Sequence, residues 1–408
     1  DSLNRPLIRL ALTRDPPSPA RGGRAIVCAA PTWPGLFPTS QAMTRFILAF
    51  ATLFIWLVPA SAQTITASGF KIEWQVVNRF RFFRDPAFFR LHENAWRQYL
   101  LHVDGQGLSP EERDKLVART SVLGSEHVLN DRYIAFTDIL RKNFDWRGWA
   151  SKAEGGTCYD PEKRRHLACG GIDKYVTPDS HGIELWLTSL GSGPVPADRT
   201  CVWSINGAEV AKAPCGERVS GASIALPYPA GGEISVGVEG EQPITVPAKV
   251  RDLLIAAMGD SFASGEGNPD VPVEFDDQRR FKNLYPLRKE NHAGGSARWT
   301  DTLCHRSLYG QHLRAALQIG IENRQAAVTF LDYSCSGASI EDGLLGPQDY
   351  VEREGQTSSP QPGARPLSGD SGDGQLNRLL REICLEKPEK KKGLLTCPDG
   401  KYRRAIDF

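Results

Sequence analysis

An uninterrupted apolar run, from Leu253 to Met258, ends directly at Gly259. A run of this kind is typical of a strand that is buried on both faces of a parallel sheet. Because parallel strands need long crossover connections, usually helical, the run predicts an α/β layer that begins near Asp252. A helical pattern near 306–319 and a second apolar run, from Ala326 to Asp332, predict the next crossover and strand.

A serine follows the first predicted strand, in the sequence Gly259-Asp260-Ser261. Residues just past the carboxyl end of a parallel strand lie where α/β folds bind their ligands, and glycine lets the backbone turn sharply. A serine hydroxyl becomes a nucleophile when a base takes its proton, and its own amide can help to hold the resulting oxyanion. The alternative, a glycine-rich phosphate cradle, would need the lysine of a Walker loop or the GxGxxG spacing, and both are absent.

The segment Gly259-Asp260-Ser261, extended by Ser264-Gly265-Glu266-Gly267, resembles the first block of the SGNH, or GDSL, esterases and lipases. The resemblance implies that Ser261 is the catalytic nucleophile and that its amide contributes to the oxyanion hole. It also implies a three-layer, flavodoxin-like α/β hydrolase domain, of which residues 251–408 are the N-terminal part. We expect no cofactor and no metal site.

Two further segments resemble parts of the same family. Phe330 to Ala338 is similar to its second block, which gives Gly337 the role of a second oxyanion-hole amide. Trp299 with Cys304-His305-Arg306-Ser307 is similar to the cysteine segment of secreted, lipase-like members. In those members this cysteine bonds to the one before the second-block glycine, which implies a disulfide between Cys304 and Cys335.

The later blocks of the family do not occur among the 408 residues. They are GxND, with an oxyanion-hole asparagine, and DxxH, with the base and its orienting acid. Since the run Ala405 to Phe408 would lead into GxND in the family, we expect a fragment of a longer hydrolase that is nearly inactive as it stands. His292, His305 and His312 follow the serine, but we expect surface or structural roles for them rather than that of the base.

The intact protein is expected to cleave carboxylic esters through an acyl-enzyme at Ser261. The substrate would be a small-molecule, lipid or acylated glycan ester. Polar segments at 268–300 and 342–374 lack the long apolar stretch of a lipase lid, which favours small acyl esters or acetylated glycans. An alternative is a non-catalytic secreted binding protein with a degenerate hydrolase domain.

A third function, that of a lipid-surface protein without enzyme activity, rests on one aromatic cluster. Packing in the core is the expected role of these residues, which are Phe80, Phe82, Phe83, Phe88 and Phe89.

An export signal is predicted over residues 43–62. Met43-Thr44-Arg45 precedes an apolar run from Phe46 to Val58, which is shorter than the about 20 residues of a membrane span. Small residues then lead to Ala62, so we expect cleavage near Ala62 and a secreted or periplasmic protein. Residues 1–42 are interpreted as an upstream, non-native leader, with a longer signal region or a genuine N-terminal tail as alternatives.

Eight of the nine cysteines follow the predicted signal and form four couples of sequence neighbours. An even number behind a signal predicts disulfides, although the sequence leaves other connectivities open. No CxxC occurs, which argues against zinc. The simplest pairing is Cys158 with Cys169, Cys201 with Cys215, Cys304 with Cys335, and Cys384 with Cys397.

Two regions precede the predicted hydrolase domain. Residues 63–170 are expected to be mainly helical, with capped helix starts at Asp85-Pro86 and at Ser109 to Glu112. Residues 171–250 are expected to form a β-rich, sandwich-like module, because short alternating runs are separated by turn residues. The 49 basic and 48 acidic side chains nearly cancel, so nucleic acid is not an expected partner. The oligomeric state is left open.

Overall fold

The computed structural model describes most of the chain beyond the predicted signal. These residues belong to one compact unit, Gln63–Phe408. The predicted leader, the predicted signal and His292 lie outside the described residues. The described ranges are 69–120, 155–191, 193–238, 241–270, 298–348, 352–353, 356–357, 373–391 and 394–408.

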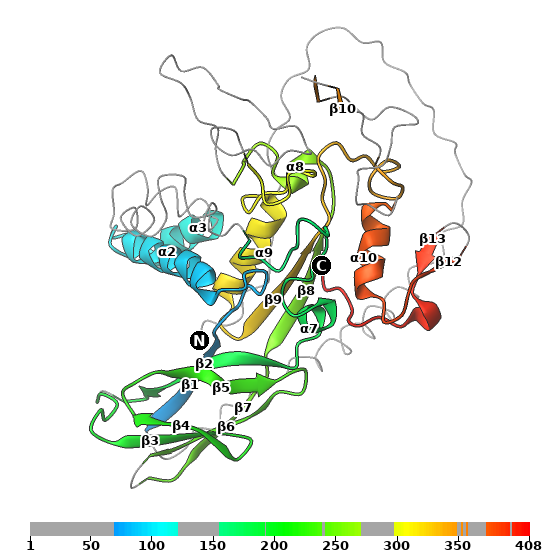
Figure 1. Cartoon of the computed structure of the whole chain (residues 1–408). Coiled ribbons are helices and arrows are strands. Elements are labelled where there is room, and N and C mark those ends of the chain that lie inside the picture. The colour runs from blue at the N-terminus through cyan, green and yellow to red at the C-terminus, as the bar shows by residue number, and fades with distance from the viewer. Residues whose placement is uncertain are drawn as a thin grey trace, which may run out of the picture. The chain divides into compact units, whose positions relative to one another are not determined.

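The predicted parallel strands are present. Strand β8 (Arg251–Ala257) pairs in parallel with β9 (Ala326–Asp332), and helix α9 (Gln311–Glu322) lies in the connection between them (Figure 1). The helix begins at Gln311, later than the sequence pattern predicted, and residues 301–306 form a tight turn that is closed by an Asp301–Arg306 bridge.

The terminal residues extend along the other edge of β8. The Asp407 amide donates to the Leu254 carbonyl at 2.9 Å, and the Ala256 amide donates to the Phe408 carbonyl at 3.0 Å. Successive residues of a strand direct their peptide groups to opposite edges. The Ala257 carbonyl faces the β9 edge, where it accepts from the Tyr333 amide, so the peptide groups of Leu254 and Ala256 that bind the terminal residues face the opposite edge. The final run is therefore hydrogen-bonded as an edge segment of this sheet.

Helices cover both faces of the two parallel strands. On one face, α9 and α2 (Pro86–Asp104) enclose the cluster that contains Phe330. On the other face, α7 (Ile172–Val176) and α10 (Gln375–Ile383) enclose the cluster that contains Leu331. The expected core role of the phenylalanine cluster is confirmed, since Phe80, Phe82, Phe83 and Phe89 are buried and Phe88 packs against them.

Two antiparallel sheets form the predicted β-rich region. One has the order β1-β2-β5 and the other the order β4-β3-β6-β7, and they share an apolar core around Trp203. We refer to these seven strands as the sandwich. Their bounds are β1 Phe70–Val76, β2 Ser180–Ser189, β3 Thr200–Ile205, β4 Ala208–Pro214, β5 Val219–Pro227, β6 Gly232–Val238 and β7 Ile244–Ala248.

The sequence expectation of a mainly helical region over 63–170 is wrong at its start. Residues Phe70–Val76 form strand β1, which pairs antiparallel with β2. Its side chains at Ile72, Trp74 and Val76 are buried in the sandwich core, and this alternation is a strand pattern. Pairing with residues more than a hundred positions later completes a sheet that the local sequence does not reveal.

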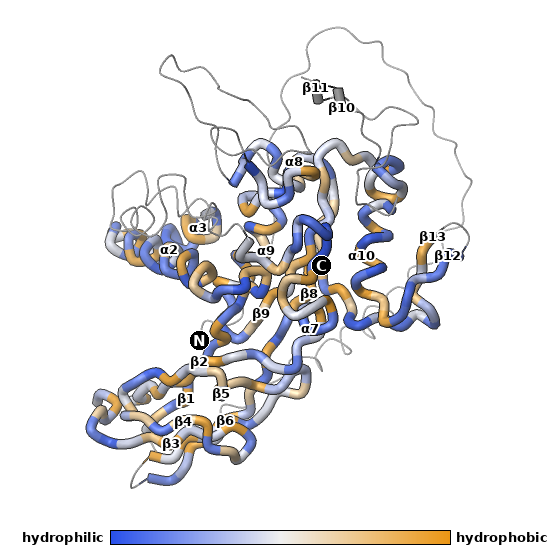
Figure 2. Tube along the Cα trace, in the orientation of Figure 1, coloured by the Kyte–Doolittle hydropathy of each residue, from blue (hydrophilic) through white to orange (hydrophobic). Residues whose placement is uncertain are grey.

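The two predicted helix starts are confirmed. Asp85 caps α2 by accepting from the Ala87 amide at 2.8 Å. Ser109 and Glu112 form the reciprocal capping box of α3 (Pro110–Arg119). In Figure 2 the trace of α2 alternates between hydrophilic and hydrophobic segments, as expected for a helix with one buried face.

All four predicted disulfides are formed, with Cα–Cα distances of 4.9, 4.9, 4.2 and 5.2 Å in chain order. They fit an oxidising compartment. In the described ranges, no helix is both long and apolar enough to cross a membrane.

The described residues thus form a mixed α/β protein with several antiparallel sheets and few helices. The remaining short elements are α8 Ser261–Ser264, η1 Pro398–Gly400, and the hairpins β10 Glu352–Arg353 with β11 Gln356–Thr357 and β12 Glu389–Lys391 with β13 Leu394–Thr396.

Candidate active site

Ser261 is the first residue of the short helix α8, directly after β8. Asp260 is the N-cap, and its side chain accepts from the Phe262 amide at 3.0 Å. Gly259 has a φ of +138°, a conformation that residues with a Cβ rarely adopt. The chain therefore turns sharply between strand and helix, and it leaves Ser261 half-buried at the carboxyl end of β8.

Both peptide groups of Gly259 are held by a side chain of α10. The Gln375 Oε1 accepts from the Gly259 amide at 2.8 Å, and the Gln375 Nε2 donates to the Gly259 carbonyl at 2.8 Å. Gln375 is 2% exposed. The amide of Cys335 donates to the same carbonyl at 3.0 Å, which ties the turn to the loop after β9. The sequence did not reveal the role of Gln375.

Gly337 lies on the loop that follows β9, with a φ of +83°. Gly337 lies two residues after Cys335, and likewise Ser261 lies two residues after Gly259. The hydrogen bond between Cys335 and Gly259 therefore brings the two loops together. Within the described ranges, no group accepts a hydrogen bond from the amide of Ser261 or of Gly337. Both amides are thus free to donate to a bound group, and they belong to two loops that the Cys335–Gly259 hydrogen bond joins.

Glu266 connects three segments around this turn. One carboxylate oxygen accepts from the Ser336 hydroxyl, and the other lies 3.1 Å from the Nδ1 of His305. The Trp299 indole donates to the Glu266 carbonyl at 3.1 Å and stacks on the His305 ring, with 4.2 Å between ring centroids. These contacts fix the loop that carries Ser336 and Gly337.

None of the histidines that follow Ser261 contacts it within the described ranges. His305 is 1% exposed and directed to Glu266, and His312 lies on α9. The expectation of surface or structural roles for these two histidines stays a prediction.

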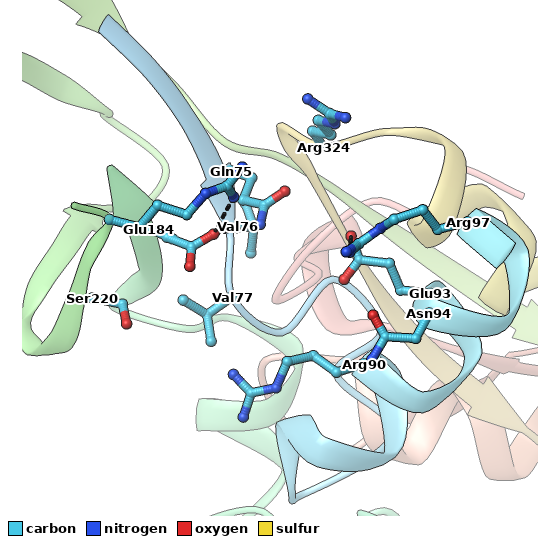
Figure 3. Close-up of a pocket in the computed structure, with 11 residues that line it drawn as sticks. Gln75, Val76, Val77, Arg90, Glu93, Asn94, Arg97, Glu184, Ser220 and Arg324 are labelled. Atoms are coloured by element: carbon cyan, nitrogen blue, oxygen red, sulfur yellow. Dashed lines mark hydrogen bonds and ion pairs between the residues drawn. The ribbon is translucent and has the colours of Figure 1, made fainter. Parts of the chain in front are cut away.

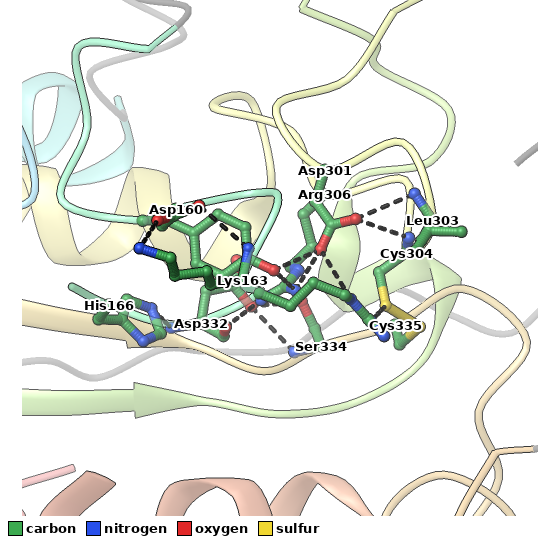
Figure 4. Close-up of polar contacts among 12 residues, drawn as sticks. Asp160, Lys163, His166, Asp301, Leu303, Cys304, Arg306, Asp332, Ser334 and Cys335 are labelled. Carbon is green, nitrogen blue, oxygen red and sulfur yellow. Dashed lines mark hydrogen bonds and ion pairs between the residues drawn. A yellow bond between two sulfur atoms is a disulfide. The ribbon is translucent and has the colours of Figure 1, made fainter. Parts of the chain in front are cut away.

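A buried ion cluster supports the Cys304–Cys335 disulfide (Figure 4). One oxygen of Asp301 accepts from the amides of Leu303 and Cys304 at 2.9 and 3.2 Å, and the other contacts Arg306 and the Tyr159 hydroxyl. Burial by itself would raise the pKa of Asp301, but the charges of Arg306 and Arg164 hold it well below its ordinary value. The carboxylate thus stays ionised and orders the cysteine loop.

A second buried cluster joins α10 to the end of β9. The Asp332 amide donates to His166 Nε2 at 3.0 Å, so His166 carries its proton on Nδ1 and donates to Glu382 at 2.7 Å. The Tyr333 hydroxyl also donates to Glu382, at 2.6 Å. Burial opposes ionisation, but the contacts with His166 and Tyr333 hold the pKa of Glu382 at about 2.

Two large apolar side chains lie close in sequence to the candidate site residues and face solvent. Phe262, next to Ser261, is 77% exposed, and Ile340, on the Gly337 loop, is 69% exposed. In the described ranges, no group of three or more potential ligands could hold a metal ion.

Comparison with known proteins identifies no relative of this chain. No protein-family model, no curated protein and no solved structure matches this chain.

Proposed function

We propose that this protein is an exported serine ester hydrolase of the SGNH type, with Ser261 as nucleophile. The observation that carries the proposal is the pair of amides, those of Ser261 and Gly337, which have no acceptor in the described ranges. They belong to loops that follow adjacent parallel strands, where ligands bind in α/β folds.

The proposed chemistry follows from this arrangement. A base removes the Ser261 proton, the hydroxyl oxygen attacks the ester carbonyl, and the two amides stabilise the oxyanion. The alcohol leaves, and water then hydrolyses the acyl-enzyme. The resemblance to the SGNH family assigns the base to a DxxH block and a third oxyanion donor to a GxND block. The Ser261 turn, braced by Gln375, would keep the nucleophile in position.

The arrangement of strands supports a flavodoxin-like order. Strand β8 has β9 on one edge and the terminal residues on the other. In the flavodoxin-like order 2-1-3-4-5, the first strand likewise lies between the second and the third. The terminal run, around Asp407, would then occupy the place of the third strand.

Export and a small acyl substrate complete the proposal. The predicted signal at 43–62 and the four disulfides support a secreted or periplasmic protein. The exposed side chains of Phe262 and Ile340 offer apolar contact for an acyl group. We propose carboxylic esters of small acids, free or on glycans, as substrates.

One observation favours a second function, that of a non-catalytic secreted binding protein. His305 is directed to Glu266 and stacks on Trp299, and no histidine in the described ranges contacts Ser261. A reading frame that stops after Phe408 would favour this function, whereas GxND and DxxH blocks beyond it would favour the hydrolase.

The test uses the product of the complete reading frame, purified from an oxidising compartment. We expect it to hydrolyse p-nitrophenyl acetate and butyrate and to react with a fluorophosphonate at Ser261. Ser261→Ala should lower kcat by about 1,000-fold or more, whereas Ser223→Ala, at an exposed position of β5, should leave it unchanged. Equal activity of the two variants would contradict the proposal.

A further inference from the structure

A cavity of about 540 Å³ lies between the sandwich and helix α2 (Figure 3). In Figure 3, Arg90 and Arg97 extend from α2, and Glu184 and Ser220 approach from the sandwich strands. The charged side chains that line the cavity are Arg90, Arg97, Arg218, Arg324, Glu93 and Glu184. Cations thus outnumber carboxylates in the lining.

The two carboxylates already have partners. Glu93 pairs with the buried Arg79, behind the lining, and lies 3.9 Å from Arg97. Glu184 accepts from Gln75 at 2.6 Å and from Arg218 at 3.0 Å.

Arg90 and Arg324 remain without a counter-charge. Both are exposed at the cavity, and in the described ranges no carboxylate lies within ion-pair distance of either. Burial is the main cause that lowers the pKa of Arg79, and the charges of Arg324 and Arg97 lower it further, which shows that positive charge accumulates here.

We propose that this cavity binds a small polyanion that carries phosphate, sulfate or carboxylate groups. Arginine suits such a ligand because its planar guanidinium forms paired hydrogen bonds with oxyanions. The volume lies within the range of about 300–1,000 Å³ that is usual for small-molecule sites. Two of the four arginines have no carboxylate partner in the part of the chain that the structure describes, so the ligand supplies the missing charge.

This site is separate from the candidate active site. Arg324 precedes the amino end of β9, whereas Gly337 follows its carboxyl end. A strand of 7 residues spans about 20 Å, so the two sites lie at opposite ends of the parallel strands. The inference therefore does not rest on the proposed ester hydrolysis.

The test is calorimetric titration of the full chain with pyrophosphate, citrate and sulfate at low salt. We expect saturable binding of at least one probe, and the ranking of the probes distinguishes a phosphorylated, a carboxylated or a sulfated ligand. Arg90→Gln and Arg324→Gln should each weaken binding about tenfold or more, and added salt should weaken it as well. The matched control is Arg119→Gln, at an exposed position of α3 outside the lining, which should bind like the wild type.

Two results would overturn the proposal. One is the absence of saturable binding of all three probes to the wild type, and the other is equal weakening by Arg119→Gln. Thermal unfolding without ligand separates binding from a structural role. Since like charges repel, Arg90→Gln and Arg324→Gln should leave Tm unchanged or raise it, whereas a lowered Tm in both would mean that these arginines serve the fold.

Discussion

Gln375 holds Gly259 by both of its peptide groups, through two hydrogen bonds of 2.8 Å each. We predict that Gln375→Leu lowers the free energy of unfolding by about 2 kcal/mol, because it leaves the partly buried peptide groups of the turn without their partner. Since the turn positions Ser261, kcat for p-nitrophenyl acetate should fall more than KM changes. Urea denaturation and steady-state kinetics measure the two effects.

The control for this prediction is Asn377→Leu, on the same helix. If both variants kept the kcat of the wild type, Gln375 would have no positioning role.

Gly259→Ala should distort the same turn. Its φ of +138° disfavours a side chain, and a Cβ would lie 2.7 Å from the Cβ of Ala263. We expect a loss of about 1–3 kcal/mol in the free energy of unfolding, together with loss of fluorophosphonate labelling at Ser261. Gly221→Ala, where the added Cβ meets no atom within 4 Å, is the matched control and should label normally.

The Cys304–Cys335 disulfide should matter for both stability and chemistry. It closes a loop of 31 residues, so replacing both cysteines by serine should lower the free energy of unfolding by about 3–4 kcal/mol. The Cys201–Cys215 pair closes a loop of 14 residues in the sandwich, and its removal should cost about 3 kcal/mol. Only the first replacement should also lower esterase kcat, and a similar loss of kcat in both would contradict this view.

Stability should depend on the ionisation of Glu382. Its pKa of about 2 in the folded protein lies below the ordinary value of 4.5, so the unfolded chain binds the proton more readily. The stabilising contribution is therefore complete above about pH 4.5 and is lost as the pH falls toward 2.

Glu382→Gln should accordingly destabilise the protein strongly at pH 7 and much less at pH 2.5, as measured by urea denaturation. Glu389→Gln, on the exposed hairpin strand β12, should show no such pH dependence. Equal destabilisation by Glu382→Gln at both pH values would show that the substitution acts through the changed shape of the side chain and not through the loss of its charge.

Local signals in the sequence predicted local structure well. The capping box at Ser109 and the apolar run before Gly259 each depend on residues within a few positions of one another. The four disulfides span somewhat longer separations, 11 to 31 residues, but each joins cysteines that are neighbours in the order of cysteines along the chain.

Contacts across long separations were not predictable in this way. Gln375 reaches Gly259 over 116 residues, and His166 reaches Glu382 over 216. The helical prediction for the region around β1 rested on the two capped helix starts that follow it, and only the pairing with β2 identifies the strand. Arg324 and Arg90 carry no motif at all, and only the fold brings them to one cavity.

The position of β1 in the chain, before α2 and apart from the other sandwich strands, limits how the protein can be divided. The chain enters the sandwich at β1, leaves it after Val76 to supply α2, and returns at Ser180 before it continues into β8. No single cut separates the sandwich from the α/β layer, because a boundary at residue 171 strips an edge strand from β2. The two parts are thus expected to unfold together and to be exchanged only as one unit in engineered chimaeras.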